Sequence, residues 1–351
     1  WFEIRCRPPN LMVSIDEVAR LAGVSTATVS RALSGRGHVS DVTRKRVHTA
    51  ADSLGYVVSA SASSLASGRT RNIGVLVPFL DRWFFSTVLS GVASALTRRG
   101  YDITLYNLTA DKTARETIFE TFLRRQRVDG IIAVSIELNS HETDRLADLG
   151  IPVIGIGGPN PRLTTLTVDD VAVARLATEH LLGLGHRTIA HIGANPEFDI
   201  DFHLPTHRRQ GFEQAMADAG LEVQPALYEP ADFTIEGGFR AAKQLLGRPG
   251  LKPTAIFAAS DEMAIGALLA ARDLGYRVPQ DLSVIGIDGH ELGEFFQLTT
   301  VDQFPLGQGE RAVDAILAEL EPAPHDTTGA DPHRALPYEL VVRGTTSRVD
   351  A

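Results

Sequence analysis

Hydrophobic positions near the N-terminus recur at helical spacing and predict three short helices. The first begins at Ser14, which forms a capping box with Glu17, and it ends at Gly23. Ser25 and Ser40 stand where they can cap the second and third helices. The positions expected to face a common core are Ile15, Val18, Leu21 and Ala22, then Val29, Ala32 and Leu33, then Val42, Val47, Ala50 and Leu54. Three short helices with a tight first turn form a helix-turn-helix unit.

The second of these helices, in "GVSTATVSRAL" (residues 23–33), is built from unusually short side chains. Ser and Thr compete with the helix backbone for hydrogen bonds and are poor choices for an ordinary surface helix. Short side chains do let the backbone come close to a grooved surface, and Arg31 supplies one long reach. The stretch therefore favours a helix that reads DNA over one that only supports the fold.

From residue 72 the pattern changes to short apolar runs that alternate with amphipathic stretches. The runs are "NIGVLVP" (72–78), "YDITLYNL" (101–108), "DGIIAVS" (129–135), "IPVIGIG" (151–157), "TIAHIGA" (188–194), "EVQPALYEP" (222–230), "AIFAAS" (255–260) and "LSVIGIDG" (282–289). Such runs are typical of buried parallel strands, with helices such as 90–100 and 115–127 between them. The alternation predicts a doubly wound α/β fold in two lobes, with a ligand crevice at the carboxyl ends of the strands.

The charge is divided unevenly along the chain. Residues 1–71 hold ten Lys and Arg against five Asp and Glu, while the remaining 24 basic and 38 acidic residues make the rest strongly acidic. A length of 351 residues, with 44% hydrophobic and 22% charged residues, fits two or three globular domains. A small basic end on an acidic body indicates a partner attracted to that end only, and nucleic acid is the obvious candidate.

Several protein classes are disfavoured by the sequence. No apolar run approaches the roughly 18 residues that span a bilayer, and "WFEIRCRPPNLM" lacks the hydrophobic core of a secretory signal. Cys6 is the only cysteine, so no disulfide can form within one chain, and we expect a cytoplasmic protein without membrane contact. Met12 is a natural start position, so we interpret residues 1–11 as a tag or start-site extension.

Motifs for catalysis are not found. The "GIGG" at 155–158 is followed by Pro-Asn-Pro instead of a helix and fails the dinucleotide pattern, and "LGLGH" at 182–186 is better explained as a helix end. His203 and His207 flank a proline, but two histidines in a loop are a weak metal signal. We therefore expect no enzyme activity, no cofactor and no metal.

The segment from Ile15 to Tyr56 carries a more specific pattern, with "AGVS", "TVSRAL" and a "VS..TR..V" to "LGY" tail in order. It resembles the DNA-binding headpiece of the lactose/galactose repressor (LacI/GalR) family. The resemblance implies that the second helix enters the major groove. By position it assigns base reading to Thr26, Ala27 and Arg31, and DNA-backbone contacts to Ser25, Thr28 and Ser30.

Residues 59–72, "SASASSLASGRTRN", have the composition of a flexible linker. The resemblance implies a hinge helix that orders on DNA and inserts a leucine into the minor groove, and Leu65 occupies that position. Val58, Ser59 and Ser63 depart from the Pro, Asn and Arg that the family often has there, which removes one expected phosphate contact.

The body resembles the family's effector domain, a periplasmic-binding-protein-like fold, over essentially its full length. "VDDVAVARLATEHLLGLGHRTIAHIG", "RRQGFEQAM", "AIFAASDEMAIGALLAARDLGYRVPQDLSVIGIDG" and "LTTVDQ" occur in family order. By position the resemblance assigns effector binding to Phe84, Phe85, Arg208, Phe233, Ser260, Asp261 and Asp288. Gly289 replaces a common second acid or amide, which removes one expected polar contact.

Aromatic faces with Arg and Asp suit a sugar, a polyol or a similar small polar metabolite. Alternatives remain at single positions. At least one of Phe84 and Phe85 could be a core residue, Trp83 could line the pocket or a subunit surface, and Asp261 could cap a helix. Arg208 and Asp288 do not distinguish a sugar from a purine or another anionic effector.

These patterns define the expected domains. A helix-turn-helix headpiece spans 12–57, a hinge helix or linker 58–71, and an effector-binding and dimerisation domain 72–351. Within the last, we expect an N-lobe at about 72–171 and 303–333 and a C-lobe at about 172–302 and 334–345. The fold class is thus an all-α headpiece followed by a two-lobed α/β effector domain.

The expected function is that of a homodimeric transcriptional regulator, a repressor, that binds a pseudo-palindromic double-stranded operator under control of a small polar effector, a sugar. A nucleobase or nucleoside acting as co-repressor is the alternative within the class. A solute-binding protein would share the body but needs a signal peptide and no headpiece. No terminal leucine heptad follows "PYELVVRGTTSR", so a tetramerising coiled coil is not expected.

Overall fold

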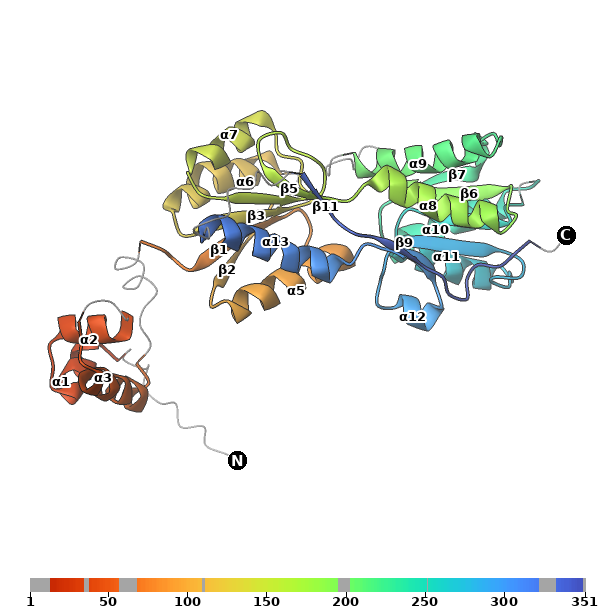
Figure 1. The fold of residues 1–351 in the computed structure, drawn as a ribbon. Helices are drawn as coiled ribbons and strands as arrows, with labels where there is room; N and C mark the ends of the chain where they lie inside the picture. The colour runs from red at the N-terminus through yellow and green to blue at the C-terminus, as the bar shows by residue number, and fades with distance from the viewer. Residues whose placement is uncertain are drawn as a thin grey trace, which may run out of the picture. The chain divides into compact units, whose positions relative to one another are not determined.

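The computed structural model describes residues 13–34, 38–56, 68–108, 111–194, 203–250, 252–321 and 333–349. The chain divides into two compact units, residues 1–71 and residues 72–351, called here the headpiece and the body. Both are drawn in Figure 1. The extension expected at 1–11 and Leu65, the expected minor-groove wedge, lie outside the described residues.

The headpiece folds into the three expected helices, α1 (Ile15–Ala22), α2 (Thr26–Ser34) and α3 (Asp41–Leu54). The predicted capping box is confirmed, because the Glu17 backbone N–H donates to Ser14 Oγ at 3.3 Å and the Ser14 N–H donates to the Glu17 carboxylate at 2.8 Å. Gly23 ends α1 at a φ of +63°, a conformation that glycine adopts without steric cost. Ser40 caps α3 through the Thr43 N–H at 3.3 Å.

The headpiece core corrects two positions of the expected pattern. Its buried residues are Val18, Ala19, Ala22, Val29, Ala32, Val47, Ala50 and Ala51. Leu21 and Val42, both expected to face inward, are 56% and 78% exposed. The buried face of α1 centres between Ala19 and Ala22, and Leu21 lies about a third of a turn away from it. Val42 lies on the side of α3 opposite Val47, so its apolar character alone was misleading.

The body contains two six-stranded sheets, one in each lobe. The N-lobe sheet has the order β11-β5-β4-β3-β1-β2 and the C-lobe sheet the order β12-β10-β9-β8-β6-β7. The strands are β1 (Asn72–Val77), β2 (Asp102–Asn107), β3 (Gly130–Val134), β4 (Val153–Ile156), β5 (Thr164–Thr167), β6 (Ile189–Ala194), β7 (Tyr228–Ala231), β8 (Ala255–Ala258), β9 (Ser283–Asp288), β10 (Thr299–Asp302), β11 (His333–Ala335) and β12 (Glu339–Val341). Neighbouring strands pair in parallel except β10 and β12, which are antiparallel.

Helices cover both faces of each sheet, which confirms the doubly wound α/β class. The N-lobe helices are α5 (Trp83–Arg98), α6 (Lys112–Thr117), α7 (Ser140–Asp148) and α13 (Pro305–Leu320). The C-lobe helices are α8 (Asp170–Gly183), α9 (Leu204–Asp218), α10 (Ile235–Gly247), α11 (Asp261–Asp273) and α12 (Gly293–Phe296). Four separate apolar clusters, two per lobe, fill the spaces between sheet and helices. Figure 1 shows the two lobes side by side, each with helices on either side of its strands.

Two segments differ from their expected form. The expected helix at 115–127 is instead the end of α6, a π-helical turn at Ile118–Phe122 and a 3-10 turn at Leu123–Arg125. This irregular winding buries Ile118, Phe119 and Leu123 on one side. The run at 222–230 is a strand only from Tyr228 onward, since a 3-10 turn occupies Pro225–Leu227.

The chain passes between the lobes three times, from β5 to α8, from β10 to α13 and from β11 to β12. Consequently the residues beside these passages lie at the junction of the lobes. No helix in the described part of the chain is long and apolar enough to cross a membrane.

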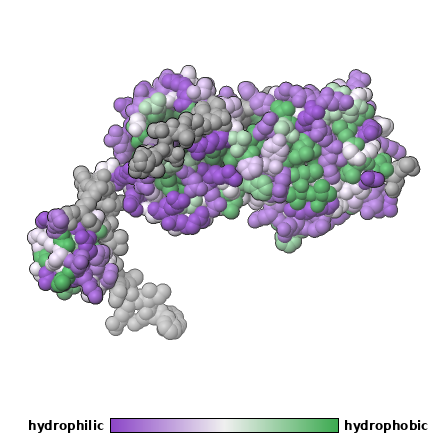
Figure 2. Space-filling model, viewed as in Figure 1, coloured by the Kyte–Doolittle hydropathy of each residue, from purple (hydrophilic) through white to green (hydrophobic). Residues whose placement is uncertain are grey.

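Part of the body surface is apolar. Figure 2 shows a broad hydrophobic area on the visible face of the C-lobe, bordered by hydrophilic residues. Among large apolar side chains, Phe295 in α12 is 83% exposed and Leu306 at the start of α13 is 49% exposed. Surfaces of this kind are common where proteins associate.

Candidate functional site

The second helix of the headpiece presents its expected DNA-contacting residues on an accessible side. Ser25 caps α2, accepting from the Thr28 N–H at 3.2 Å, and the two hydroxyl groups lie 2.9 Å apart. Ala27, Ser30 and Arg31 are exposed, whereas Val29 and Ala32 on the other side are buried. The exposed side therefore carries only short side chains and one guanidinium.

The base-reading candidate Arg31 is held along its own helix. Its Nε donates to the Ala27 backbone carbonyl at 3.1 Å, so the guanidinium already lies beside a second candidate reader. Thr26 is half-buried at the first turn of α2. A residue that the pattern did not single out, Arg44 of α3, donates to the Ala32 carbonyl at 3.3 Å and joins the two helices. Its cation lies near the C-terminal end of α2, where positive charge is favourable.

A cavity of about 220 Å³ lies in the body, lined by both lobes. Its lining residues are Phe79, Arg82, Phe84, Phe85, Ser135, Gly157, Val168, Asp170, Leu204, Arg208, Asp232, Phe233, Ser260, Glu262, Asp288, Gln303 and Gln308. They come from the segments that follow β1, β3, β4, β7 and β8, from the end of β9, from the starts of helices, and from the passages between the lobes. The crevice expected at the carboxyl ends of the strands is therefore present.

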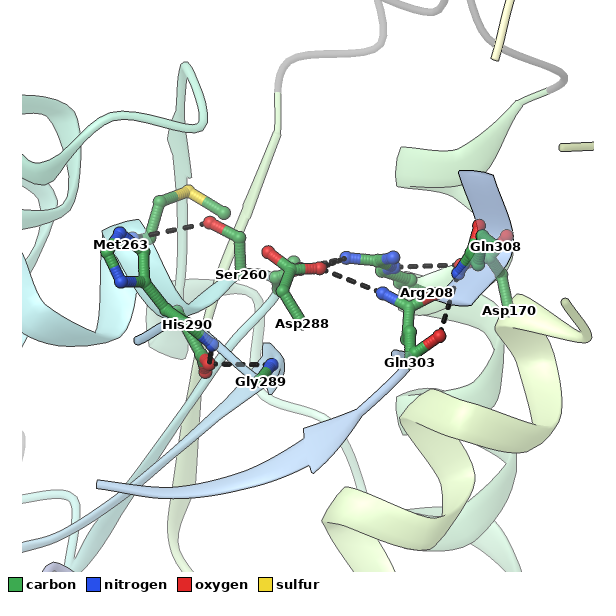
Figure 3. A network of polar contacts seen from close by, with 11 residues as sticks. Asp170, Arg208, Ser260, Met263, Asp288, Gly289, His290, Gln303 and Gln308 are labelled. Atoms are coloured by element: carbon green, nitrogen blue, oxygen red, sulfur yellow. Dashed lines mark hydrogen bonds and ion pairs between the residues drawn. The ribbon is translucent and has the colours of Figure 1, made fainter. Parts of the chain in front are cut away.

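A buried polar network forms one side of this cavity. Arg208 of α9 is 3% exposed, and its Nε lies 2.9 Å from Asp170 Oδ1. Its Nη1 lies 3.6 Å from Asp288 Oδ1 and also donates to the Ala259 carbonyl. Gln303 Nε2 donates to Asp288 Oδ1 at 2.8 Å. Figure 3 shows Arg208 lying between the two carboxylates. The guanidinium is thus fixed in place before any ligand arrives.

The network extends from the C-lobe to a helix of the N-lobe. Gln308 of α13 donates through Nε2 to the Gln303 carbonyl at 2.9 Å, and both glutamines are 3% exposed. Asp288 ends β9 at a φ of +127°, an unusual conformation for a non-glycine residue. Burial raises the pKa of the Asp288 carboxyl to about 7, although the Arg208 guanidinium opposes the rise.

Aromatic rings form the other side of the cavity. Phe79 and Phe84 each meet Phe85 edge to face, with ring centroids 5.6 Å apart in both pairs. Phe85 is 9% exposed and belongs to the N-lobe core, so it serves both the core and the cavity lining. Phe233 stands across from them in the C-lobe, before α10, at a φ of +56°.

Ser260 and Asp261 both accept hydrogen bonds from backbone N–H groups, and of the two only Ser260 lines the cavity. Ser260 caps α11 by accepting from the Met263 N–H at 3.3 Å. Asp261 is fully buried, and its Oδ2 accepts from the Gly289 and His290 backbone N–H groups at 2.9 and 2.8 Å. Burial, then the neighbouring Asp288 carboxyl, raises the pKa of Asp261. Of the expected effector contacts, Asp261 is the one that lies behind the cavity instead of facing it.

The structure explains why a glycine stands at position 289, which the sequence did not. It adopts a φ of +81°, and a Cβ added there would lie 2.2 Å from Asp302 Oδ1. A second acid or amide at this position would therefore clash unless the Asp302 side chain or the loop moved.

Trp83 makes a contact between the lobes. Its ring, at the start of α5, stacks on His290 of the C-lobe with centroids 4.3 Å apart and planes 17° apart. Beside it, burial raises the pKa of Glu262 in α11, and the Arg82 guanidinium and the Trp83 backbone N–H oppose that rise. Trp83 is not among the cavity-lining residues, and the alternative that it lies at a subunit surface stays a prediction.

The histidine pair shows no sign of a metal site. The rings of His203 and His207 are 6.5 Å apart and nearly perpendicular. Across the described residues, no three His, Cys, Asp or Glu side chains are grouped so that they could hold a metal ion.

Comparisons with known proteins account for both units. Residues 14–59 match the family described as "Bacterial regulatory proteins, lacI family", and residues 178–346 match the "Periplasmic binding protein-like domain". The HTH-type transcriptional repressor PurR of Vibrio vulnificus (strain CMCP6) is 33% identical over 344 residues, 97% of this chain and 100% of that protein. The chain belongs to the LacI family of bacterial regulatory proteins.

Solved structures of LacI-family members agree. The Lac repressor dimer bound to operator and the anti-inducer ONPF has a TM-score of 0.82 at 27% identity, covering 95% of this chain and 99% of that one. The complex of the transcriptional regulator CelR with cellobiose has a TM-score of 0.68 at 29% identity, covering 95% and 99%. This LacI-family chain is therefore a DNA-binding transcriptional repressor with a helix-turn-helix headpiece and a periplasmic-binding-protein-like body.

Several cavity residues of this LacI-family chain were not found by the sequence reasoning. They are Phe79, Arg82, Asp170, Asp232, Glu262, Gln303 and Gln308. Asp170 was hidden because it stands at the start of an ordinary helix, and Gln303 because it follows a short strand that was not recognised. A usable signal existed in "VDDVA" and "TTVDQ", since polar residues directly after a strand lie at the ligand edge of a parallel sheet.

Proposed function

We propose that the chain represses transcription as a homodimer, and that a small polar effector bound in the inter-lobe cavity controls its affinity for a pseudo-palindromic operator. α2 of each headpiece enters the major groove, where Thr26, Ala27 and Arg31 read base edges. Ser25, Thr28 and Ser30 contact the DNA backbone. Arg31 holds a guanine through O6 and N7, a pairing worth about 1–3 kcal/mol of discrimination.

The buried Arg208 network is the observation that carries the effector part of the proposal. It joins a C-lobe cation, two carboxylates and a glutamine beside a passage between the lobes. N-lobe phenylalanines line the same cavity, so a ligand that fills it contacts both lobes. Phe84, Phe85 and Phe233 supply apolar faces, and Ser260 and Asp288 supply polar contacts. The cellobiose complex of a relative supports a carbohydrate as the effector.

Homodimer formation follows from the DNA site. A pseudo-palindromic operator requires two headpieces related by twofold symmetry. The exposed apolar side chains of the body, such as Phe295, support pairing with a second copy. We propose a cytoplasmic, non-enzymatic protein in which the cavity binds its ligand without transforming it.

Operator selection followed by effector titration tests this function. The full-length chain selects its operator from random double-stranded DNA, and fluorescence anisotropy then gives the operator Kd with and without candidate sugars. We expect one sugar to change the operator Kd at least tenfold, and the operator to change the sugar Kd by the same factor, because coupling is reciprocal. The sign of the change separates an inducer from a co-repressor.

Arg208→Lys is the matched variant, because it keeps the charge but loses the planar fork. It should bind operator normally and lose the response to the sugar. Selection of no preferred sequence over random DNA would reject sequence-specific repression, and an unchanged response in Arg208→Lys would reject the cavity as the effector site.

A further inference from the structure

The charged groups that line the cavity are unbalanced. In the described part of the chain they are the carboxyl groups of Asp170, Asp232, Glu262 and Asp288 and the guanidinium groups of Arg82 and Arg208. Acids therefore outnumber bases two to one around a small enclosed volume. Interactions between charges are stronger there than in water, because the surroundings are less polarisable.

Both cations are already engaged by groups of the protein. Arg208 lies between Asp170 and Asp288, at 2.9 and 3.6 Å, and donates to a backbone carbonyl as well. The Arg82 guanidinium lies 5.7 Å from the centroid of the Phe79 ring, and its charge lowers the pKa of Glu262. An anionic ligand would have to compete with Asp170 and Asp288 for Arg208, and near Arg82 it would meet the Glu262 carboxyl group.

Among the remaining polar groups of the lining, the carboxyl groups outnumber the hydroxyl groups of Ser135 and Ser260. An ionised carboxylate accepts but cannot donate, whereas a protonated one, which the raised pKa of Asp288 and Glu262 favours, donates through one oxygen. The Nε2 donors of Gln303 and Gln308 are used on Asp288 and on the Gln303 carbonyl. Asp232 accepts from Thr234 Oγ1 at 2.6 Å and lies 3.6 Å from the exposed Arg240, which leaves it further lone pairs. A ligand that satisfies such a lining must supply hydroxyl or N–H groups.

The aromatic side of the cavity adds a requirement of shape. Phe79, Phe84 and Phe233 offer ring surfaces with no polar atoms. Such surfaces accommodate the apolar face of a sugar ring or a flat aromatic ring. A ligand that is polar on every side, with a bulky hydrated group, would leave this side unsatisfied.

We infer that the effector is an uncharged or cationic ring compound rich in hydrogen-bond donors, and that the cavity rejects its phosphorylated or carboxylated counterparts. This inference rests on the proposed function of the cavity as the effector site. It narrows the class to free sugars, amino sugars and nucleosides, and it excludes sugar phosphates, uronic acids and nucleotides.

Matched ligand pairs test the inference with the full-length chain. The neutral or cationic members are glucose, glucosamine, ribose, cellobiose and cytidine, and the anionic members are glucose-6-phosphate, glucuronate, ribose-5-phosphate and cytidine monophosphate. Isothermal titration gives the Kd, and anisotropy gives the effect on operator binding. We expect binding to be confined to the first set, with the anionic partner of any binder at least tenfold weaker.

Two charge-removing variants identify the cause of the selectivity. Glu262→Gln and Asp232→Asn each remove one carboxylate from the lining, and each should reduce the ratio between the Kd values of the two members of a pair at least threefold. Asp273→Asn is the control, because Asp273 ends the same helix as Glu262 but lies on the surface, paired with Lys243. This control variant should leave the ratio between the Kd values of the two members of a pair unchanged.

The possible outcomes distinguish a failure of this inference from a failure of the proposed function. If an anionic member binds as tightly as its partner and alters operator binding, the effector site stands and the inference is overturned. If Asp273→Asn reduces the ratio of the two Kd values as much as Glu262→Gln does, the selectivity comes from the net charge of the whole protein, and the inference is overturned. If no ligand of either set binds while operator binding is intact, the proposed effector control falls, and the inference falls with it.

Discussion

The headpiece and the body prepare their functional side chains in opposite ways. Most of the residues proposed to contact DNA from α2 and its cap are exposed, although Thr26 and Thr28 are half-buried. Beyond the cap at Ser25, the one long side chain among them, Arg31, donates to a backbone carbonyl of its own helix. In the cavity, the buried Arg208 lies against the buried Asp288 and the partly buried Asp170. A helix that enters a DNA groove needs short side chains, whereas a ligand site needs charged side chains that are held in place.

The difference has an energetic consequence. Removing an exposed DNA-contacting side chain should change binding and leave folding intact, whereas removing a member of the buried network should change folding first. Exposed groups are solvated in the free protein, but a buried charge without its partner is not. Substitutions in the two regions can therefore be compared directly.

The largest expected effect is on stability. Arg208→Ala leaves Asp170 and Asp288 without their shared cation, and we expect it to lower the free energy of unfolding of the body by about 3–5 kcal/mol. Denaturant titration of the full-length chain measures the loss. Arg209→Ala is the control, because Arg209 is exposed and pairs with Glu213 on the surface, where removal costs about 1 kcal/mol or less. Equal losses would contradict a prearranged network.

A smaller effect is expected in the headpiece. Arg31→Ala should weaken operator binding by about 1–3 kcal/mol, with stability unchanged, because it removes a bidentate base contact. Binding to random DNA should fall only as far as the loss of one positive charge requires. Arg20→Ala, an exposed arginine of α1, should weaken both kinds of binding alike. An equal loss on operator and random DNA for Arg31→Ala would contradict its base-reading role.

The pH dependence of the body is the next prediction. Burial raises the pKa of Asp288 from 3.8 to about 7, so between these values the folded chain keeps a proton that the unfolded chain has lost. This group therefore makes the body less stable as pH rises toward 7, by about 1.4 kcal/mol per pH unit at most, and the loss ends above pH 7. Asp288→Asn should flatten the slope of stability against pH between 5 and 7. An unchanged slope of stability against pH in this variant would contradict the raised pKa of Asp288.

The smallest expected effect concerns the contact between the lobes. Trp83→Ala should remove about 1 kcal/mol of ring stacking on His290 and let the lobes separate more often. Hydrogen exchange of the backbone near His290 should quicken, while Trp83→Phe should retain most of the protection. If both variants exchange at the wild-type rate, the stacking does not hold the lobes.

Much of the fold could be predicted because local chemistry determines it. Capping residues such as Ser14 and Gly23 set helix ends within one turn of chain, and apolar runs such as 72–78 set buried strands. Short strands were missed at β5, β10, β11 and β12, because three or four residues are too few to show a periodic pattern of apolar positions. Leu21 and Val42 were misplaced because one apolar side chain does not define a helix face.

The candidate site was predictable only where the resemblance to the family assigned a residue by its position. Phe84, Arg208, Phe233 and Asp288 were found through resemblance, and all of them line the cavity. Gln303 was missed because its role depends on Asp288, a residue on a different strand. The position of Asp261 behind the cavity depends on how the loop at Gly289 folds over it, which local sequence does not reveal.

The passages between the lobes give the cavity a mechanical property. Gln303 follows β10 at one passage, Asp170 follows β5 at another, and Gln308 lies in the helix that the first passage enters. Any rotation of one lobe against the other must turn about these same segments. The side chains proposed to contact the effector thus lie on the segments about which the lobes turn, so a small shift of these side chains would be passed on as a rotation of one lobe against the other.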